Sequence, residues 1–312
     1  MKNLRDFVLS GLFLALAGAN SANADFLYVS RADIVTPANS SITRIDTTTK
    51  VETIFATTGL NNPAGIAFDR AGNLYVANGG NNTIEKFTPG GVGSVFASGG
   101  LLNSPDSLAF DSLGNLYVAN RNSIERFTPG GVGSIFATNG VNGPRGLAID
   151  SSNNVFVSNQ ATLGSEFIEK FTPGGVGSVF ATTANGVNNP RGLAIDSLSN
   201  VYLVNAGDQK VVKFTPGGLN SVYYNGNGMV DPVGLAIDGN GTLYVANGDG
   251  LNILRIPPGT FSAEVFATES VRPAFLAFRS TAVPEPSTFA LLGVGMGFAL
   301  VARARLSRRS VC

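Results

Sequence analysis

Two arginines are the side chains of this sequence best suited to bind a ligand. Arg145 and Arg191 each follow a proline in the segment PRGLAID, which occurs at 144–150 and 190–196. A guanidinium group can hold a carboxylate, such as that of an acidic sugar, through two parallel hydrogen bonds. The alternative is an ordinary surface ion pair with a neighbouring loop, for which Asp106 is a candidate partner. The sequence alone favours the ion pair, because surface arginines usually have such a partner.

A recurring asparagine is the second candidate for ligand binding. It ends five apolar segments of the LYVAN type. The five residues are Asn78, Asn120, Asn159, Asn205 and Asn247. Five amides around one opening could bind a sugar, or could help an acidic group to hold Ca²⁺ through oxygen. An asparagine at a strand end can instead cap the following turn with its own side chain, and its recurrence in five copies favours this structural role.

The composition excludes most kinds of catalytic centre. The chain has 312 residues, no histidine and a single cysteine, Cys312. Histidine-dependent nucleophiles, histidine-ligated metals, cysteine clusters and disulfides are therefore excluded. A catalytic site also needs different groups at one point, whereas the positions above largely repeat one residue. We expect no catalytic residues and no resident cofactor, with Ca²⁺ as the metal that stays possible.

The charge balance argues against nucleic acid as a partner. Lysine plus arginine and aspartate plus glutamate each number 21, so the formal net charge is zero. Binding to phosphates needs a basic excess. Residues 25–302 hold 15 cations and 20 anions, because most of the remaining cations lie at the two ends. This part of the chain is mildly acidic.

The middle of the chain is one unit repeated about six times, and this unit must position the candidate residues. The PAGIAFD-like segment begins at 63, 105, 144, 190, 232 and 273. Each unit holds four short β-rich runs separated by turn residues such as Thr-Pro-Gly-Gly. Four antiparallel strands in about 40–45 residues is the period of a β-propeller blade. The repeats predict an all-β, six-bladed propeller over 25–279.

The two ends of the repeat region predict how the ring closes. The chain begins with FLYVS at 26–30, which matches the second strand of a blade, and ends with PAFLAF at 273–278, which matches the first. Pairing of these segments would complete one blade and remove the exposed strand edges. Closure would place the candidate arginines and asparagines on one face, and the aspartates that begin the Asp-x-x-Gly-Asn turns on the other. The Glu85, Glu125 and Glu169 series is expected to be solvated.

The repeat unit resembles the NHL repeat and, more distantly, the gluconolactonase and senescence-marker propellers. The residues that carry this resemblance are the P-x-G-L-A-I-D and G-N-L-Y-V-A-N pair. Those families include binding scaffolds and enzymes, so the resemblance implies the fold and leaves the function open. The metal site of the gluconolactonases needs a Glu that no matching strand end of this sequence supplies.

The two termini have the pattern of targeting segments. Residues 1–24 combine Lys2 and Arg5, an apolar stretch and an Ala-Asn-Ala cleavage pattern, which predicts a signal peptide. Residues 287–302 form an uncharged apolar run that Arg303 and further arginines follow. This order predicts a linker at 280–286, a transmembrane helix at 287–302 and a basic cytoplasmic tail at 303–312.

The C-terminal pattern also resembles the PEP-CTERM sorting signal. Pro284, Glu285 and Pro286 precede the apolar run and the arginine cluster in the order typical of that signal. The resemblance implies export to the cell envelope or the extracellular matrix and processing by an exosortase-type enzyme, with membrane anchoring beforehand.

These observations favour an exported binding or scaffold propeller over an enzyme. Its partner would be an extracellular polysaccharide or another protein, bound through the face that carries Arg145, Arg191 and the five asparagines. The alternative is a Ca²⁺-dependent hydrolase or lyase of the lactonase-like propeller class. A matrix protein without a discrete ligand is a third possibility.

Overall fold

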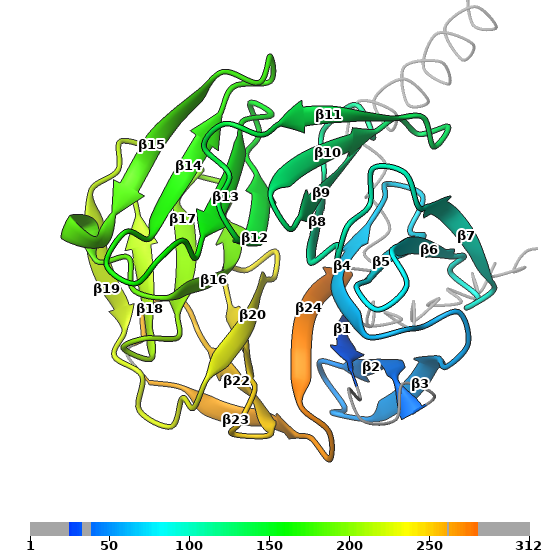
Figure 1. The fold of residues 1–312 in the computed structure, drawn as a ribbon. Coiled ribbons are helices and arrows are strands. Elements are labelled where there is room, and N and C mark those ends of the chain that lie inside the picture. The colour runs from blue at the N-terminus through cyan, green and yellow to red at the C-terminus, as the bar shows by residue number, and fades with distance from the viewer. Residues whose placement is uncertain (1–24, 33–38, 261, 280–312) are drawn as a thin grey trace, which may run out of the picture. The chain divides into compact units, whose positions relative to one another are not determined.

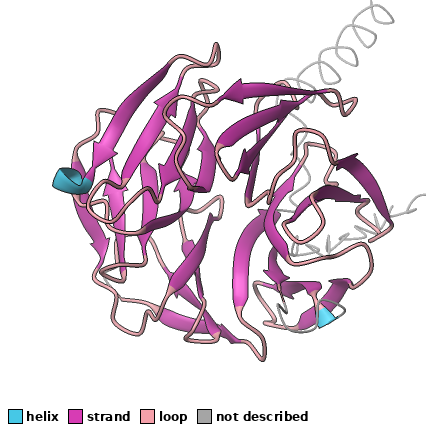
Figure 2. Cartoon of the chain, viewed as in Figure 1, coloured by secondary structure: helices cyan, strands magenta, loops and turns pink. Residues whose placement is uncertain are grey.

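The protein is a six-bladed β-propeller in a computed structural model that describes residues 25–32, 39–260 and 262–279. Six four-stranded antiparallel sheets surround a common axis (Figure 1). The inner strands β4, β8, β12, β16, β20 and β24 contact one another in a closed cycle. Strands and turns make up nearly all of the described chain, and 3₁₀ helix, as in η2 (Thr183–Asn185), is rare (Figure 2).

Each blade runs outward from the axis, and we number the blades from the N-terminus. Blade 1 contains β24 (Pro273–Arg279), β1 (Phe26–Arg31), β2 (Ser41–Asp46) and β3 (Glu52–Ala56). Blade 2 contains β4 (Pro63–Phe68), β5 (Leu74–Asn78), β6 (Thr83–Phe87) and β7 (Gly93–Ser98). Blade 3 contains β8 (Ser107–Phe110), β9 (Leu116–Asn120), β10 (Ser123–Phe127) and β11 (Gly133–Ala137).

The other three blades follow the same order. Blade 4 contains β12 (Pro144–Ile149), β13 (Val155–Asn159), β14 (Phe167–Phe171) and β15 (Gly177–Thr182). Blade 5 contains β16 (Pro190–Ile195), β17 (Val201–Asn205), β18 (Lys210–Phe214) and β19 (Asn220–Tyr224). Blade 6 contains β20 (Pro232–Ile237), β21 (Leu243–Asn247), β22 (Asn252–Ile256) and β23 (Glu264–Thr268).

Blade 1 joins the two ends of the propeller, as the sequence predicts. Strand β24 pairs antiparallel with β1, with Phe26 opposite Arg279 and Leu27 opposite Phe278. In Figure 1 the orange β24 lies beside the blue β1. Closure gives the terminal strand β24 a hydrogen-bonded partner, so that blade 1 has four strands like the other blades.

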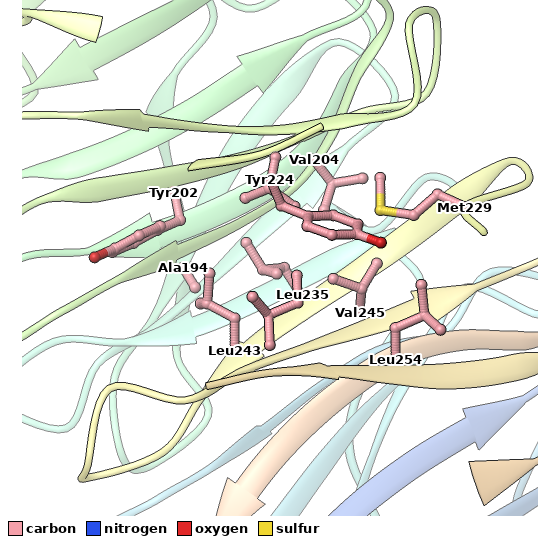
Figure 3. Close-up of a cluster of buried hydrophobic side chains, with 11 residues drawn as sticks. Ala194, Tyr202, Val204, Tyr224, Met229, Leu235, Leu243, Val245 and Leu254 are labelled. Carbon is pink, nitrogen blue, oxygen red and sulfur yellow. The ribbon is translucent and has the colours of Figure 1, made fainter. Parts of the chain in front are cut away.

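The core lies between neighbouring blades, because the second strand of each blade is apolar on both faces of its sheet. In blades 2 to 6, the second strand is buried along its whole length. Between blades 5 and 6, Tyr202, Val204 and Met229 pack with Leu235 and Val245 (Figure 3). Aromatic rings link successive blades edge to face, for example Phe96 and Phe127 with centroids 6.2 Å apart. Such pairs stabilise packing beyond the apolar area that they bury.

The turns on one face form as the sequence predicts, and one expectation about the strands is wrong. Asp111 begins a turn in which its carboxylate accepts hydrogen bonds from the Asn115 backbone N–H and side chain, at 2.8 and 2.7 Å. Glu85, Glu125 and Glu169, expected in solvent, are instead buried. Each lies on the third strand of its blade. Glu85 and Glu169 lie close to a glycine of the fourth strand and a glycine of the loop before the inner strand, and burial raises the pKa of these two carboxyls.

Part of the predicted organisation lies outside the described residues. This applies to the signal peptide at 1–24, the linker with Pro284, Glu285 and Pro286, the helix at 287–302 and the tail at 303–312. In the part of the chain that the structure describes, no helix has the length and apolarity to span a membrane.

Candidate functional site

The site begins with the residue that follows the proline of each inner strand. The six copies of the repeat differ at this position, which lies near the axis. From blade 1 to blade 6 it is occupied by Ala274, Ala64, Asp106, Arg145, Arg191 and Val233. All six residues line one cavity of about 390 Å³. The propeller therefore brings six different repeat copies to one point on its axis.

Glycines beside this position allow the inner strands to approach closely. Gly65 lies against the backbone of Asp106, and its N–H donates to the Asp106 carbonyl oxygen at 2.5 Å. Gly146 lies in the same way against Arg191, where a Cβ would collide with the Arg191 carbonyl oxygen. Two blades depart from this pattern: Ser107 replaces the glycine in blade 3, and Phe275 replaces it in blade 1 and lines the cavity. Together with Pro63, Ala64 and Val233, the aromatic ring makes the wall of the cavity predominantly apolar.

Asp106 and Arg145 form the ion pair that the sequence suggests. Arg145 donates from Nη1 to Asp106 Oδ2 at 3.4 Å and from Nε to Gln160 Oε1 at 2.8 Å. The Arg145 side chain is 51% exposed and that of Asp106 is 23% exposed. Surrounding protein desolvates the Asp106 carboxyl and raises its pKa, against the opposing effects of Arg145 and Arg191. This ion pair is long for a charged hydrogen bond, and Gln160 is the closer partner of the Arg145 guanidinium.

Arg191 belongs to a larger charged group with a residue that sequence reasoning missed. Arg191 donates from Nη2 to Asp231 Oδ1 at 2.9 Å, and Asp231 also bonds Arg272 through its other oxygen. Arg272 reaches Asp249 Oδ1 through Nε at 3.1 Å. Desolvation lowers the pKa of Arg191, which Asp231 opposes. Arg191 Nε is buried and has no hydrogen-bond partner among the described residues.

A signal for Arg272 exists in the sequence. It directly precedes the inner proline of blade 1, where the other blades have residues suited to a left-handed backbone. These residues are Asn62, Ser104, Gly143, Asn189 and Asp231, with φ between 47° and 59°. Arg272 is the exception in this set, and it lines the axial cavity. The other blades have small polar residues or glycine at this position, so an arginine there indicates a role other than forming the turn.

The five asparagines lie on the same face, but their amides bond within the chain. Asn159 accepts the Asn142 N–H at Oδ1 at 2.8 Å and donates from Nδ2 to the Gly140 carbonyl oxygen at 3.2 Å. Asn78, Asn120, Asn205 and Asn247 make the equivalent two bonds to the loop before their own inner strand. All five are buried. The axial cavity is not lined by any of them, so binding of a ligand by these residues stays a prediction.

No metal centre of protein side chains is evident in the described region. Within 25–32, 39–260 and 262–279, the acidic residues do not form a group of three or more that could hold an ion. Asp106 is the acidic residue that lines the axial cavity.

Comparison with known proteins supports the interpretation of the repeat region and that of the C-terminal segment. Residues 60–87 match the NHL repeat, and residues 282–309 match the PEP-CTERM protein-sorting motif. No curated protein matches the chain significantly. The PEP-CTERM motif indicates export to the cell envelope and processing of the exosortase type.

Solved structures share the fold at low sequence identity. A chain in the crystal structure of a nidogen/laminin complex is 18% identical with a TM-score of 0.71, and the match covers 83% of this chain and 100% of that one. A streptogramin B lyase structure is 20% identical with a TM-score of 0.57, covering 68% of this chain and 72% of that one. A catalytically inactive histidine-to-alanine variant of virginiamycin B lyase from Staphylococcus aureus with quinupristin is 15% identical with a TM-score of 0.60, covering 84% and 94%. The chain is thus an NHL-repeat-like β-propeller protein with a C-terminal PEP-CTERM sorting motif.

Proposed function

We propose that this protein is an exported, non-enzymatic binding module of the cell envelope that holds a carboxylate-bearing ligand at its axial cavity. The ligand would belong to a polysaccharide or to another protein. The observation that carries the proposal is the convergence of the six variable inner-strand positions on one cavity. A residue needed only for the fold would repeat from blade to blade, as the asparagines do. The variation is therefore concentrated where a ligand can reach it.

The charges at the cavity favour an anionic ligand. Arg145, Arg191 and Arg272 line it, against the single carboxylate of Asp106. Asp231 neutralises part of this charge from behind, since it bonds both Arg191 and Arg272. Asp249 also bonds Arg272 from outside the lining, so the excess of positive charge is confined to the lining itself. A guanidinium group there binds a carboxylate well because its donors match the two oxygens. Phe275 and Val233 add the apolar surface that small-molecule sites usually contain.

The enzymatic alternative has weaker support. Lyases with this fold exist among the similar structures, and in one of them a histidine-to-alanine variant is catalytically inactive. This chain has no histidine, so it lacks the side chain on which that lyase depends. A Ca²⁺-dependent hydrolase would need a metal site, and Asp106 is the lone carboxylate that lines the cavity. Release of a product from a lactone or ester substrate, dependent on added Ca²⁺, would support this alternative.

Calorimetric titration of the full chain with galacturonic acid and with neutral galactose tests the proposal. We expect binding of the acid and none of the neutral sugar. Arg145→Ala should weaken binding about tenfold, as expected for loss of one charged hydrogen bond. Arg70→Ala is the matched control, because Arg70 is an exposed arginine in the turn at the opposite end of its blade's inner strand. Equal binding of both sugars, or equal effects of both variants, would reject an arginine-dependent carboxylate site.

The pH dependence of the same titration gives an independent test. The raised pKa of Asp106 means that a fall in pH neutralises this group earlier than an ordinary aspartate. Neutral Asp106 no longer repels a ligand carboxylate beside Arg145 and Arg191. Affinity for galacturonate should therefore rise as the pH falls below neutrality, and Asp106→Asn should bind tightly without this rise. Affinity that falls in the wild type would contradict the placement of the carboxylate.

A further inference from the structure

A second cavity adjoins the axial one on the same face. It has a volume of about 480 Å³ and extends over the loops of blades 2 to 4. Asn62, Ala64, Asp106 and Arg145 line both cavities. Shared walls make the two cavities neighbouring parts of one track, which leads from the axis to Arg121 at its outer part. A ligand confined to the axis would leave this second part of the track unused.

The lining of the second cavity differs in chemistry from that of the axial one. It contains the side chains of Asn62, Asn122 and Asn142 and the hydroxyl of Ser104, with glycine backbone between them. No aromatic side chain lines it, and no apolar side chain there is larger than proline. Amides and hydroxyls offer both donors and acceptors, which suits a ligand rich in hydroxyl groups.

Arg121 gives the outer part of the track a second cation. It is exposed and follows directly after Asn120, at the start of the turn between β9 and β10. In the part of the chain that the structure describes, Arg121 has no ion pair. The track thus has one cationic group at the axis, formed by Arg145, Arg191 and Arg272, and a separate one at Arg121. Two separated cations with polar groups between them fit a ligand whose negative charges are spaced along a chain.

We infer that the track binds a linear acidic oligosaccharide, with one uronate carboxylate at the axial arginines and the next sugar units over blade 3 toward Arg121. This inference rests on the proposed function, because it assigns the class of ligand for the same axial site. The polar outer cavity favours a saccharide over an acidic peptide. Peptides are commonly held by a sheet edge or an apolar groove, whereas the outer part of this track runs over loop ends and has no apolar side chain larger than proline.

Titration of the full chain with galacturonic acid, tri-galacturonic acid and hexaglutamate separates the alternatives. The trisaccharide should bind at least about tenfold more tightly than the monosaccharide, because it adds a second charged contact. Arg121→Ala should remove most of this gain and leave the affinity for the monosaccharide unchanged. Asn122→Ala should act in the same direction with a smaller loss. Arg191→Ala should weaken both ligands, and Arg70→Ala neither.

Different outcomes would overturn different parts of the assignment. If the monosaccharide binds and the trisaccharide binds no more tightly, the extended track is rejected while the axial carboxylate site stands. The same holds if Arg121→Ala leaves trisaccharide affinity intact. If hexaglutamate binds as tightly as the trisaccharide and depends equally on Arg121, the ligand is a peptide and the saccharide assignment is rejected. Absence of binding by every acid would reject the proposed function itself. Arg121 and Asn122 are exposed, so their variants should keep the thermal unfolding midpoint of the wild type.

Discussion

Five blades attach the loop before their inner strand in one way, and the blade that joins the chain ends does so in another. In blades 2 to 6 a buried asparagine at the end of the second strand bonds the backbone of that loop. Blade 1 has Arg31 at this position, since Arg31 lies opposite Pro273 as Asn78 lies opposite Pro63. Arg31 bonds Glu269, which precedes Pro273 by as many residues as Gly59 precedes Pro63.

The difference is one of charge. The repeated blades attach this loop with a neutral amide, whereas the blade that closes the ring attaches it with an ion pair. An amide satisfies one N–H and one carbonyl oxygen and carries no charge, so it can be buried at little cost once it is bonded. The Arg31–Glu269 pair has to offset the desolvation of two charges. Arg31 also contacts Glu52 at 2.5 Å, whose side chain is 34% exposed. We call the Arg31–Glu269 attachment of blade 1 the seam. It is the attachment that should respond to pH and to loss of one partner.

The largest expected effect is on the seam itself. Arg31→Ala should lower the free energy of unfolding by about 3–5 kcal/mol, because it leaves the fully buried Glu269 without its cation. Urea unfolding at pH 7 measures this change. Arg44→Ala, on the next strand of the same blade, removes a partly exposed arginine that bonds Thr53 and should cost at most about 1 kcal/mol. Equal losses would mean that the seam is no more dependent on charge than the surface.

The second effect is the pH dependence of the seam. Burial raises the pKa of Glu269 to about 7, with Arg31 opposing and Glu52 adding to the rise. The folded state therefore retains a proton that the unfolded state releases near pH 4.5. The contribution to stability is complete below about pH 4.5 and is lost as the pH rises through 7, by up to about 3 kcal/mol.

Urea unfolding at pH 5 and pH 8 isolates this group when wild type and Glu269→Gln are compared. The wild type should lose more stability between these pH values than the variant does. Glu264→Gln is the control, because Glu264 lies in the same blade and Arg255 lowers its pKa, so it should not change the slope in this window. If Glu269→Gln has the same slope as the wild type, Glu269 does not titrate between pH 5 and pH 8.

The third effect concerns a neutral attachment. Asn159→Ala should cost about 2 kcal/mol, since it leaves the Asn142 N–H and the Gly140 carbonyl oxygen without their partner. The loss should be independent of pH between 5 and 8, in contrast with the seam. Asn240→Ala, at an exposed turn, is the control and should stay within about 0.5 kcal/mol of the wild type. A strong pH dependence in Asn159→Ala would remove the distinction between the two kinds of attachment.

Much of the fold could be predicted from the sequence because the repeat states it six times. The strand order, the aspartate turns and the closure through β24 and β1 all follow from segments that recur with small changes. The seam charges could not be predicted in the same way. Arg31 and Glu269 come from opposite ends of the propeller, and no repeat of the pattern shows that they meet.

The candidate site was predictable in part for the same reason. Arg145 and Arg191 stand out because they break the repeat, and both line the axial cavity. Arg272 was missed because it precedes the inner proline of its blade, whereas Arg145 and Arg191 follow the inner proline of theirs. The asparagines were expected to cap their own turns, and Asn78 and Asn247 do bond Thr83 and Asn252 there. The main partners, in the loop before the inner strand, become adjacent only when the first two strands pair.

The smallest expected effect comes from turning the seam into a neutral attachment. Blade 3 provides the pattern, because Asn120 there bonds the carbonyl oxygen of Leu101, whose φ is not positive. The double variant Arg31→Asn, Glu269→Leu copies this pair onto blade 1. It removes both buried charges together, and such a replacement is often neutral or stabilising. Its free energy of unfolding at pH 7 should lie within about 1 kcal/mol of the wild type, above that of Arg31→Ala, and the part of the pH slope due to Glu269 should vanish. A double variant as unstable as Arg31→Ala would show that the closing blade needs its ion pair for more than attachment of the loop.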